Sequence, residues 1–83
     1  MSELTVAVIS PEQTVFEGTA PSVVAPAYDG EVGILPGHAP MLTLLGEGVL
    51  RIGERIRVRV KGGFLQVADN VVRVVTEQAK AVS

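Results

Sequence analysis

Hydrophobic and polar residues alternate in short runs along most of the chain, and no stretch keeps a helical repeat of apolar residues for three turns. The runs are rich in β-branched residues, with fifteen valines, and such side chains pack well on a pleated sheet. Glycine and proline separate the runs. The pattern predicts an all-β fold, with strands at 4–9, 14–19, 22–25 (stopped by Pro26), 31–35, 41–45, 48–52, 56–60, 63–68 and 71–76, and a frayed end at 78–83.

Two hairpins follow from the alternation of side chains between the faces of a sheet. In the first, Leu50 and Ile52 share a face with the apolar residues of the next strand only if the loop has an odd number of residues. We therefore expect a three-residue loop at 53–55. In the second, a two-residue turn at Asp69 and Asn70 leaves one face wholly apolar, and asparagine tolerates positive φ.

Length and composition narrow the class of protein. A chain of 83 residues holds one domain. With 47% hydrophobic and 19% charged residues it is not a disordered tail. The absence of cysteine excludes a disulfide framework, a thiolate zinc site and a thiol nucleophile. The net charge of −2 argues against a free-standing nucleic-acid binder, which is usually basic.

Membrane and targeting segments are not indicated. The longest uncharged stretch, 32–46, is broken by glycine and proline, whereas a membrane helix needs about 20 mostly apolar residues. The first residues, Met1 to Glu3, lack the basic segment of a secretory signal. We therefore expect no direct insertion into a membrane.

Few side chains are suited to catalysis. His38 is the only histidine, and it has neither the further ligands of a metal site nor a nearby nucleophile. The glycines at 30, 33 and 37 lack the Lys-Ser/Thr of a phosphate-binding loop. We expect no catalytic residue, no metal and no cofactor.

Basic residues alternate with apolar ones over 55–61. One interpretation is a solvated strand face whose charges prevent pairing at a sheet edge. The other is a contact face for an acidic partner. Nucleic acid is the weaker choice of partner, because no aromatic residue interleaves the basic run to stack on bases.

The segment 30–40, G-E-V-G-I-L-P-G-H-A-P, is the most distinctive in the chain. It resembles the epsilon subunit family of bacterial F-type ATP synthases, whose N-terminal domain carries a G-E-x-G-I-x-P-G-H-A-P stretch. The segments 4–12, 62–67 and 70–79 are also similar to that family, so the resemblance covers almost the whole chain in order.

The resemblance implies a single ten-stranded β-sandwich or flattened barrel, with its core at about 4–79. It further implies a non-catalytic rotor subunit that links the gamma subunit to the c-ring and couples ion translocation to ATP synthesis. Such a subunit lies at the cytoplasmic side of the bacterial inner membrane, peripherally, as part of the F1 sector. The alternative is a stand-alone β-barrel module that binds a ligand or nucleic acid through 55–61.

Site residues can be placed within this resemblance. Asp29, Glu31 and His38 are expected to contact the c-ring, and Tyr28 and Met41 the gamma subunit.

The two phenylalanines, Phe16 and Phe64, are expected to anchor the core, with an interface role as the alternative.

The family usually continues into a C-terminal helical hairpin that carries its inhibitory function. Because the sequence stops at Ser83, we expect this arm to be absent.

Overall fold

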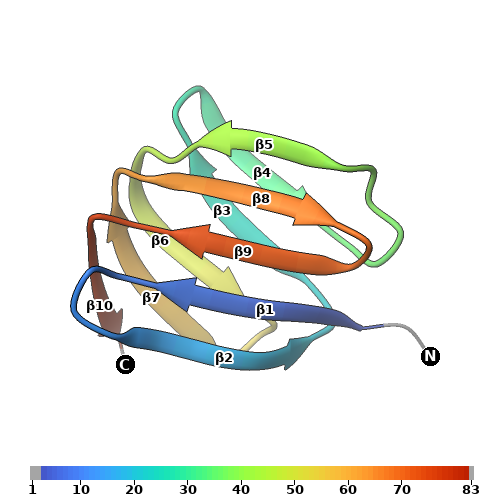
Figure 1. The fold of residues 1–83 in the computed structure, drawn as a ribbon, viewed down its shortest axis with the longest axis horizontal. Helices are drawn as coiled ribbons and strands as arrows, with labels where there is room; N and C mark the ends of the chain where they lie inside the picture. Colours follow the sequence, from blue (N-terminus) through green and yellow to red (C-terminus); the bar gives the residue numbers. More distant parts are fainter. Residues whose placement is uncertain (1–2, 83) are drawn as a thin grey trace.

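The computed structural model describes residues 3–82, which form ten β-strands (Figure 1). The strands are β1 (Leu4–Ile9), β2 (Thr14–Ala20), β3 (Val23–Ala27), β4 (Gly30–Ile34), β5 (Met41–Leu44), β6 (Glu47–Ile52), β7 (Ile56–Lys61), β8 (Phe64–Ala68), β9 (Val71–Val75) and β10 (Gln78–Val82). The predicted all-β, ten-stranded architecture is confirmed.

The strands build two five-stranded sheets that face each other. Sheet A has the order β2-β1-β9-β8-β5 and sheet B the order β10-β7-β6-β3-β4; Figure 1 shows sheet A in front of sheet B. Neighbouring strands are antiparallel except β1 and β9, which run parallel from Thr5 opposite Val71 to Ile9 opposite Val75. The result is a β-sandwich.

The core lies between the sheets and is made by every second residue of the inner strands. On β1, Leu4, Val6 and Val8 are fully buried, whereas the residues between them are not. Burying one such side chain contributes about 1.5–3 kcal/mol. The same alternation supplies Leu50, Ile52, Val58, Val60, Leu65, Val67, Val72 and Val74 from the other strands.

Both predicted hairpin registers are confirmed. The β6–β7 pair aligns Ile52 with Ile56 and Leu50 with Val58, across a three-residue loop. In the β8–β9 turn, Asp69 and Asn70 have φ values of 51° and 63°. Two successive residues with positive φ are the signature of a type I′ turn, whose twist matches that of the flanking strands.

The predicted frayed end is wrong for the residues that the structure describes, because 78–82 form β10 (Ser83, like Met1 and Ser2, lies outside them). Here Gln78 pairs with Lys61 and Val82 with Arg57, so backbone hydrogen bonding to β7 orders a segment of low strand propensity.

The strand β3 also continues through Pro26, where the sequence predicted a stop. Because β3 pairs with β6 only at Val23 and Val24, Pro26 lies beyond that ladder and its missing N–H costs no strand pairing there.

Within residues 3–82 five connections cross between the sheets, and two of them, one between β7 and β8 and one between β9 and β10, lie next to each other. Gly62 and Gly63 make the β7–β8 crossing with φ values of 72° and 102°. Thr76, buried at the β9–β10 crossing, has its hydroxyl Oγ1 2.9 Å from the carbonyl oxygens of both Gly62 and Gln78. This side chain therefore joins the two crossings.

Candidate interaction surfaces

Within residues 3–82, no group of three or more histidine, aspartate or glutamate side chains is placed to hold a metal ion. No helix in this part of the chain is long and apolar enough to cross a membrane. Three surfaces formed by these residues stand out as candidate sites.

The first surface is an apolar patch on the outer face of sheet A, formed by Leu42, Leu44 and Phe64. The two leucines are 70% and 63% exposed and Phe64 is 37% exposed. Strand register places Leu44 opposite Phe64, and Phe64 opposite Val75. A shallow apolar hollow lies between the patch residues, with Thr43 as its remaining lining residue.

The expectation that Phe64 anchors the core is therefore wrong. Leu65 is buried, so its neighbour Phe64 points out of the sandwich. The hairpin parity already contained this signal, because it placed Leu65 on the apolar inner face. Phe16, by contrast, is partly buried and packs against the core.

The two residues expected at the gamma subunit lie in different surroundings. Tyr28 is 68% exposed, and its backbone N–H donates to the carbonyl oxygen of Leu44, 3.0 Å away. This bond brings the β3–β4 turn next to the apolar patch. Met41 lies on β5 with the patch leucines but is partly buried and packs against the core.

The second surface is the loop of residues 35–40, which connects β4 of sheet B to β5 of sheet A. The backbone N–H of His38 donates to the Leu35 carbonyl at 3.1 Å, and its ring Nδ1 lies 2.7 Å from the Ala39 carbonyl. The Gly37 N–H donates to Oδ1 of Asn70 at 2.7 Å. This bond ties the loop to the β8–β9 turn, which lies beside it in Figure 1.

The three residues expected at the c-ring are not brought together. Asp29 lies in the β3–β4 turn, and His38 in the loop beyond the other end of β4. The strand β4, whose five residues span about 16 Å at a rise of about 3.3 Å per residue, lies between them. Glu31 lies near the Asp29 end, with Oε1 3.5 Å from a guanidinium nitrogen of Arg51.

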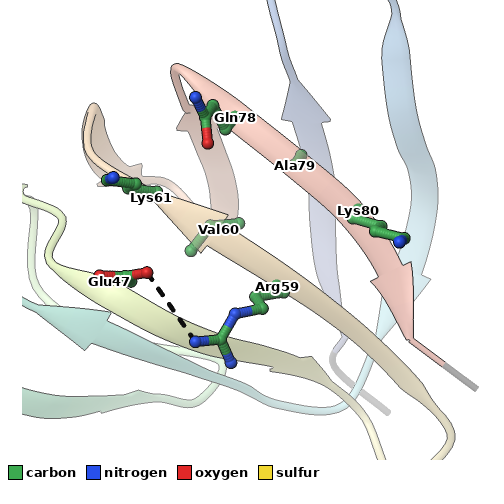
Figure 2. Close-up of a pocket in the computed structure, with 7 residues that line it drawn as sticks. All are labelled: Glu47, Arg59, Val60, Lys61, Gln78, Ala79 and Lys80. Atoms are coloured by element: carbon green, nitrogen blue, oxygen red, sulfur yellow. Dashed lines mark ion pairs between the residues drawn. The ribbon is translucent and has the colours of Figure 1, made fainter.

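The third surface, which we call the basic face, is the outer face of sheet B. It carries five exposed cations: Arg51, Arg57, Arg59, Lys61 and Lys80. Figure 2 shows part of it, a hollow in which Glu47 of β6 pairs with Arg59 of β7 at 3.8 Å.

The structure decides one question about these cations. The strand β7 pairs with β10 and β6, and β6 pairs with β7 and β3. Both β6 and β7 are therefore interior strands of sheet B. Protection of a sheet edge therefore does not account for the basic residues of β7.

The sequence of the chain matches one known protein family. Residues 3–82 match the sequence profile of the family described as ATP synthase, Delta/Epsilon chain, beta-sandwich domain. The chain belongs to this family. The resemblance noted in the sequence and the sandwich fold are both confirmed.

Members of the family include curated proteins called ATP synthase epsilon chain. One from Leptospira borgpetersenii is 46% identical over 78 residues, covering 90% of this chain and 61% of the relative. One from Synechococcus elongatus is 45% identical over 80 residues, covering 93% and 58%. The chain thus spans about three fifths of the length of these relatives.

Solved structures show the same fold. A chain in the cryo-EM structure of the Euglena gracilis mitochondrial ATP synthase (OSCP/F1/c-ring) matches with a TM-score of 0.88 at 21% identity, covering 98% of this chain and 54% of that one. A chain in the Tetrahymena thermophila mitochondrial ATP synthase central stalk/c-ring structure matches with a TM-score of 0.76 at 16% identity, covering 95% and 66%.

Proposed function

We propose that this epsilon-family domain is a non-catalytic rotor component of an F-type ATP synthase, linking the gamma subunit to the c-ring and coupling ion translocation to ATP synthesis. In this proposal it lies peripherally at the cytoplasmic side of a bacterial inner membrane, in the F1 sector. The observation that carries the proposal is the exposed apolar patch on sheet A, in a chain of this family.

The apolar patch is the proposed gamma contact. Adjacent exposed leucines and an exposed aromatic ring form the kind of anchor that dominates binding energy at protein interfaces. Tyr28 joins the patch through its backbone bond to Leu44, and its ring adds apolar area with a polar tip. Met41 contributes from the core side, where it supports the strand that carries the patch leucines.

The loop of residues 35–40 is the proposed c-ring contact. His38 is its polar residue, and the Gly37–Asn70 bond holds the loop in place. Asp29 and Glu31 belong to the same proposal as outlying charged contacts. Such exposed charges add about 0–1 kcal/mol each, and they act on orientation more than on affinity.

The mechanism is mechanical. Two contact surfaces sit on one sandwich whose inner faces are fully packed, and close-packed interiors transmit strain with little compression. The domain would thus pass torque from one partner to the other without taking part in ATP chemistry. No inhibitory role is assigned to the β-domain.

The gamma contact is tested by exchanging one leucine at a time for lysine. Leu44→Lys removes a patch side chain, and Leu35→Lys changes a leucine of nearly equal exposure (62% against 63%) outside the patch. We expect Leu44→Lys to weaken binding to purified gamma subunit at least tenfold, because burial of a leucine contributes about 1.5–3 kcal/mol. Leu35→Lys should bind gamma like the unmodified domain.

The c-ring contact is tested separately with His38→Ala. We expect this variant to lose affinity for purified c-ring while keeping full affinity for gamma. Binding of the unmodified domain to neither partner, by surface plasmon resonance or co-purification, would end the proposal. The module that binds a ligand or nucleic acid is less favoured, since the family match covers residues 3–82.

A further inference from the structure

The basic face of sheet B concentrates positive charge in a protein that is acidic overall. Five of the seven basic residues of the chain lie on it, whereas the net charge is −2. The two others lie elsewhere: Arg55 in the β6–β7 loop and Arg73 on the outer face of sheet A, opposite Gln66. The cations are thus gathered on one side of the sandwich.

The arrangement of these cations opposes the stability of the fold. Register places Arg51 directly opposite Arg57, and Arg59 directly opposite Lys80. Like charges in directly opposed cross-strand positions are destabilising. Edge protection accounts for Lys80 on the edge strand β10, but not for the arginines of β6 and β7, which are interior strands. The free domain therefore carries an electrostatic cost that its own folding does not explain.

Two carboxylates on the same face already form ion pairs with two of its arginines. Glu31 lies 3.5 Å from Arg51, and Glu47 lies 3.8 Å from Arg59. Arg57, Lys61 and Lys80 make no ion pair within residues 3–82. Three cations thus remain available to carboxylates supplied from outside.

Valine side chains lie between the cations on the basic face. Val49 lies opposite Arg59, Val82 opposite Arg57, and Val24 opposite Arg51. A polypeptide with carboxylates and aliphatic side chains on one face matches this mixture of charge and valine. Nucleic acid matches the face less well. Its phosphates would pair with the cations but not with the valines, and the face has no aromatic ring on which bases could stack.

We propose that the basic face binds an acidic amphipathic segment of a partner protein. Successive outward residues of β7, namely Arg57, Arg59 and Lys61, are spaced by about 6.6 Å. Carboxylates four residues apart on a helix are spaced by about 6 Å, within reach of flexible arginine and lysine side chains. The inference concerns a different sheet from the apolar patch and does not rest on the proposed gamma contact. Glu31, one of the outlying c-ring contacts proposed above, lies on this face beside Arg51, and the variants used below leave it unchanged.

The test uses the whole 83-residue chain and a fluorescein-labelled helical peptide with glutamate at every fourth position and leucine beside each glutamate. The double variant Arg57→Gln/Lys80→Gln removes two cations from the face. The double variant Arg55→Gln/Arg73→Gln removes two cations elsewhere, so the two variants have the same net charge. Fluorescence anisotropy at low and moderate salt measures the dissociation constants.

We expect the peptide to bind, with an affinity that falls as salt rises, and the first variant to bind about tenfold more weakly. The charge-matched variant should stay within about twofold of the unmodified protein. Equal losses of peptide affinity in the two variants would show that net charge alone causes the binding, and would overturn the proposal. Absence of peptide binding would also overturn it. So would tighter binding to a single-stranded oligonucleotide or to phosphatidylserine vesicles.

A second measurement tests the premise that the face is costly to the free domain. Replacing Arg57 and Lys80 relieves both opposed pairs, so the melting temperature should rise by about 2–8 °C. The charge-matched variant should show no comparable rise. A melting temperature lowered by Arg57→Gln/Lys80→Gln would mean that the cations stabilise the fold, and the argument for a partner would fail.

Discussion

Gly63 is the position where the sandwich leaves least room for a side chain. It lies at the β7–β8 crossing between the sheets with a φ of 102°. A Cβ atom there would overlap the carbonyl oxygen of Val75 and lie 2.7 Å from the Cα of Thr76. Those atoms cannot easily withdraw, since Val75 is paired within sheet A and the Thr76 N–H donates to Ile9 at 2.9 Å. Gly63→Ala is therefore expected to be strongly destabilising.

The loss of unfolding free energy expected for Gly63→Ala has two contributions. Positive φ costs a residue with a Cβ about 1–2 kcal/mol, and forcing an atom into a filled space costs about 1–3 kcal/mol more. Gly63→Ala should lose about 3 kcal/mol, and a domain of this size is stable by only about 4–12 kcal/mol. At about 4–8 °C per kcal/mol, the melting temperature should fall by about 12–24 °C.

Gly37 supplies a matched control. Its φ is 89°, but a Cβ there would meet nothing within 4 Å. Gly37→Ala therefore carries the conformational cost of about 1–2 kcal/mol alone. Urea unfolding of both variants, followed by circular dichroism, gives the two free energies of unfolding. If Gly63→Ala were no less stable than Gly37→Ala, the crowding inferred at the sheet crossing would be wrong.

Three further changes probe other contacts. Thr76→Val removes the hydroxyl shared by the carbonyls of Gly62 and Gln78, and should lower the free energy of unfolding in urea by about 1–3 kcal/mol. Thr76→Ser keeps the hydroxyl and should lower it much less. Equal losses in the two variants would exclude the hydroxyl as the cause. Asn70→Gly should speed amide exchange at Gly37 about two- to tenfold, and Asn70→Asp, which keeps an acceptor, should not; equal exchange in both would discount the tether. Leu65→Ala should cost about 2–5 kcal/mol because the side chain is fully buried, whereas Leu42→Ala should cost under about 0.5 kcal/mol, and similar losses would contradict the assigned faces.

Local features of the fold were predictable from the sequence because they depend on neighbours along the chain. The three-residue loop of the first hairpin follows from parity alone, and the turn at Asp69 and Asn70 from parity and residue type. The same parity places Phe64 on the outside, although its size suggested a core residue. Where two local rules disagreed, alternation was the better guide.

Features that depend on distant pairing were not predictable. The strand β10 is ordered by β7, and its own residues, two alanines among them, give little strand signal. Missing β10 makes β7 look like a sheet edge, and so hides the significance of its arginines. Likewise, Asp29 and His38 are near in sequence, but β4 holds them apart.

The parallel pairing of β1 with β9 has a consequence for how this chain is made. The β1–β2 hairpin leaves the ribosome early, but its partner strand begins only at Val71, about 65 residues after Thr5. At synthesis rates of about 5–20 residues per second, the edge of β1 that pairs with β9 stays unpaired for roughly 3–13 s. Folding of the sandwich is therefore completed only after β9 and β10 have emerged, and slowing the ribosome lengthens the interval in which nascent chains can aggregate.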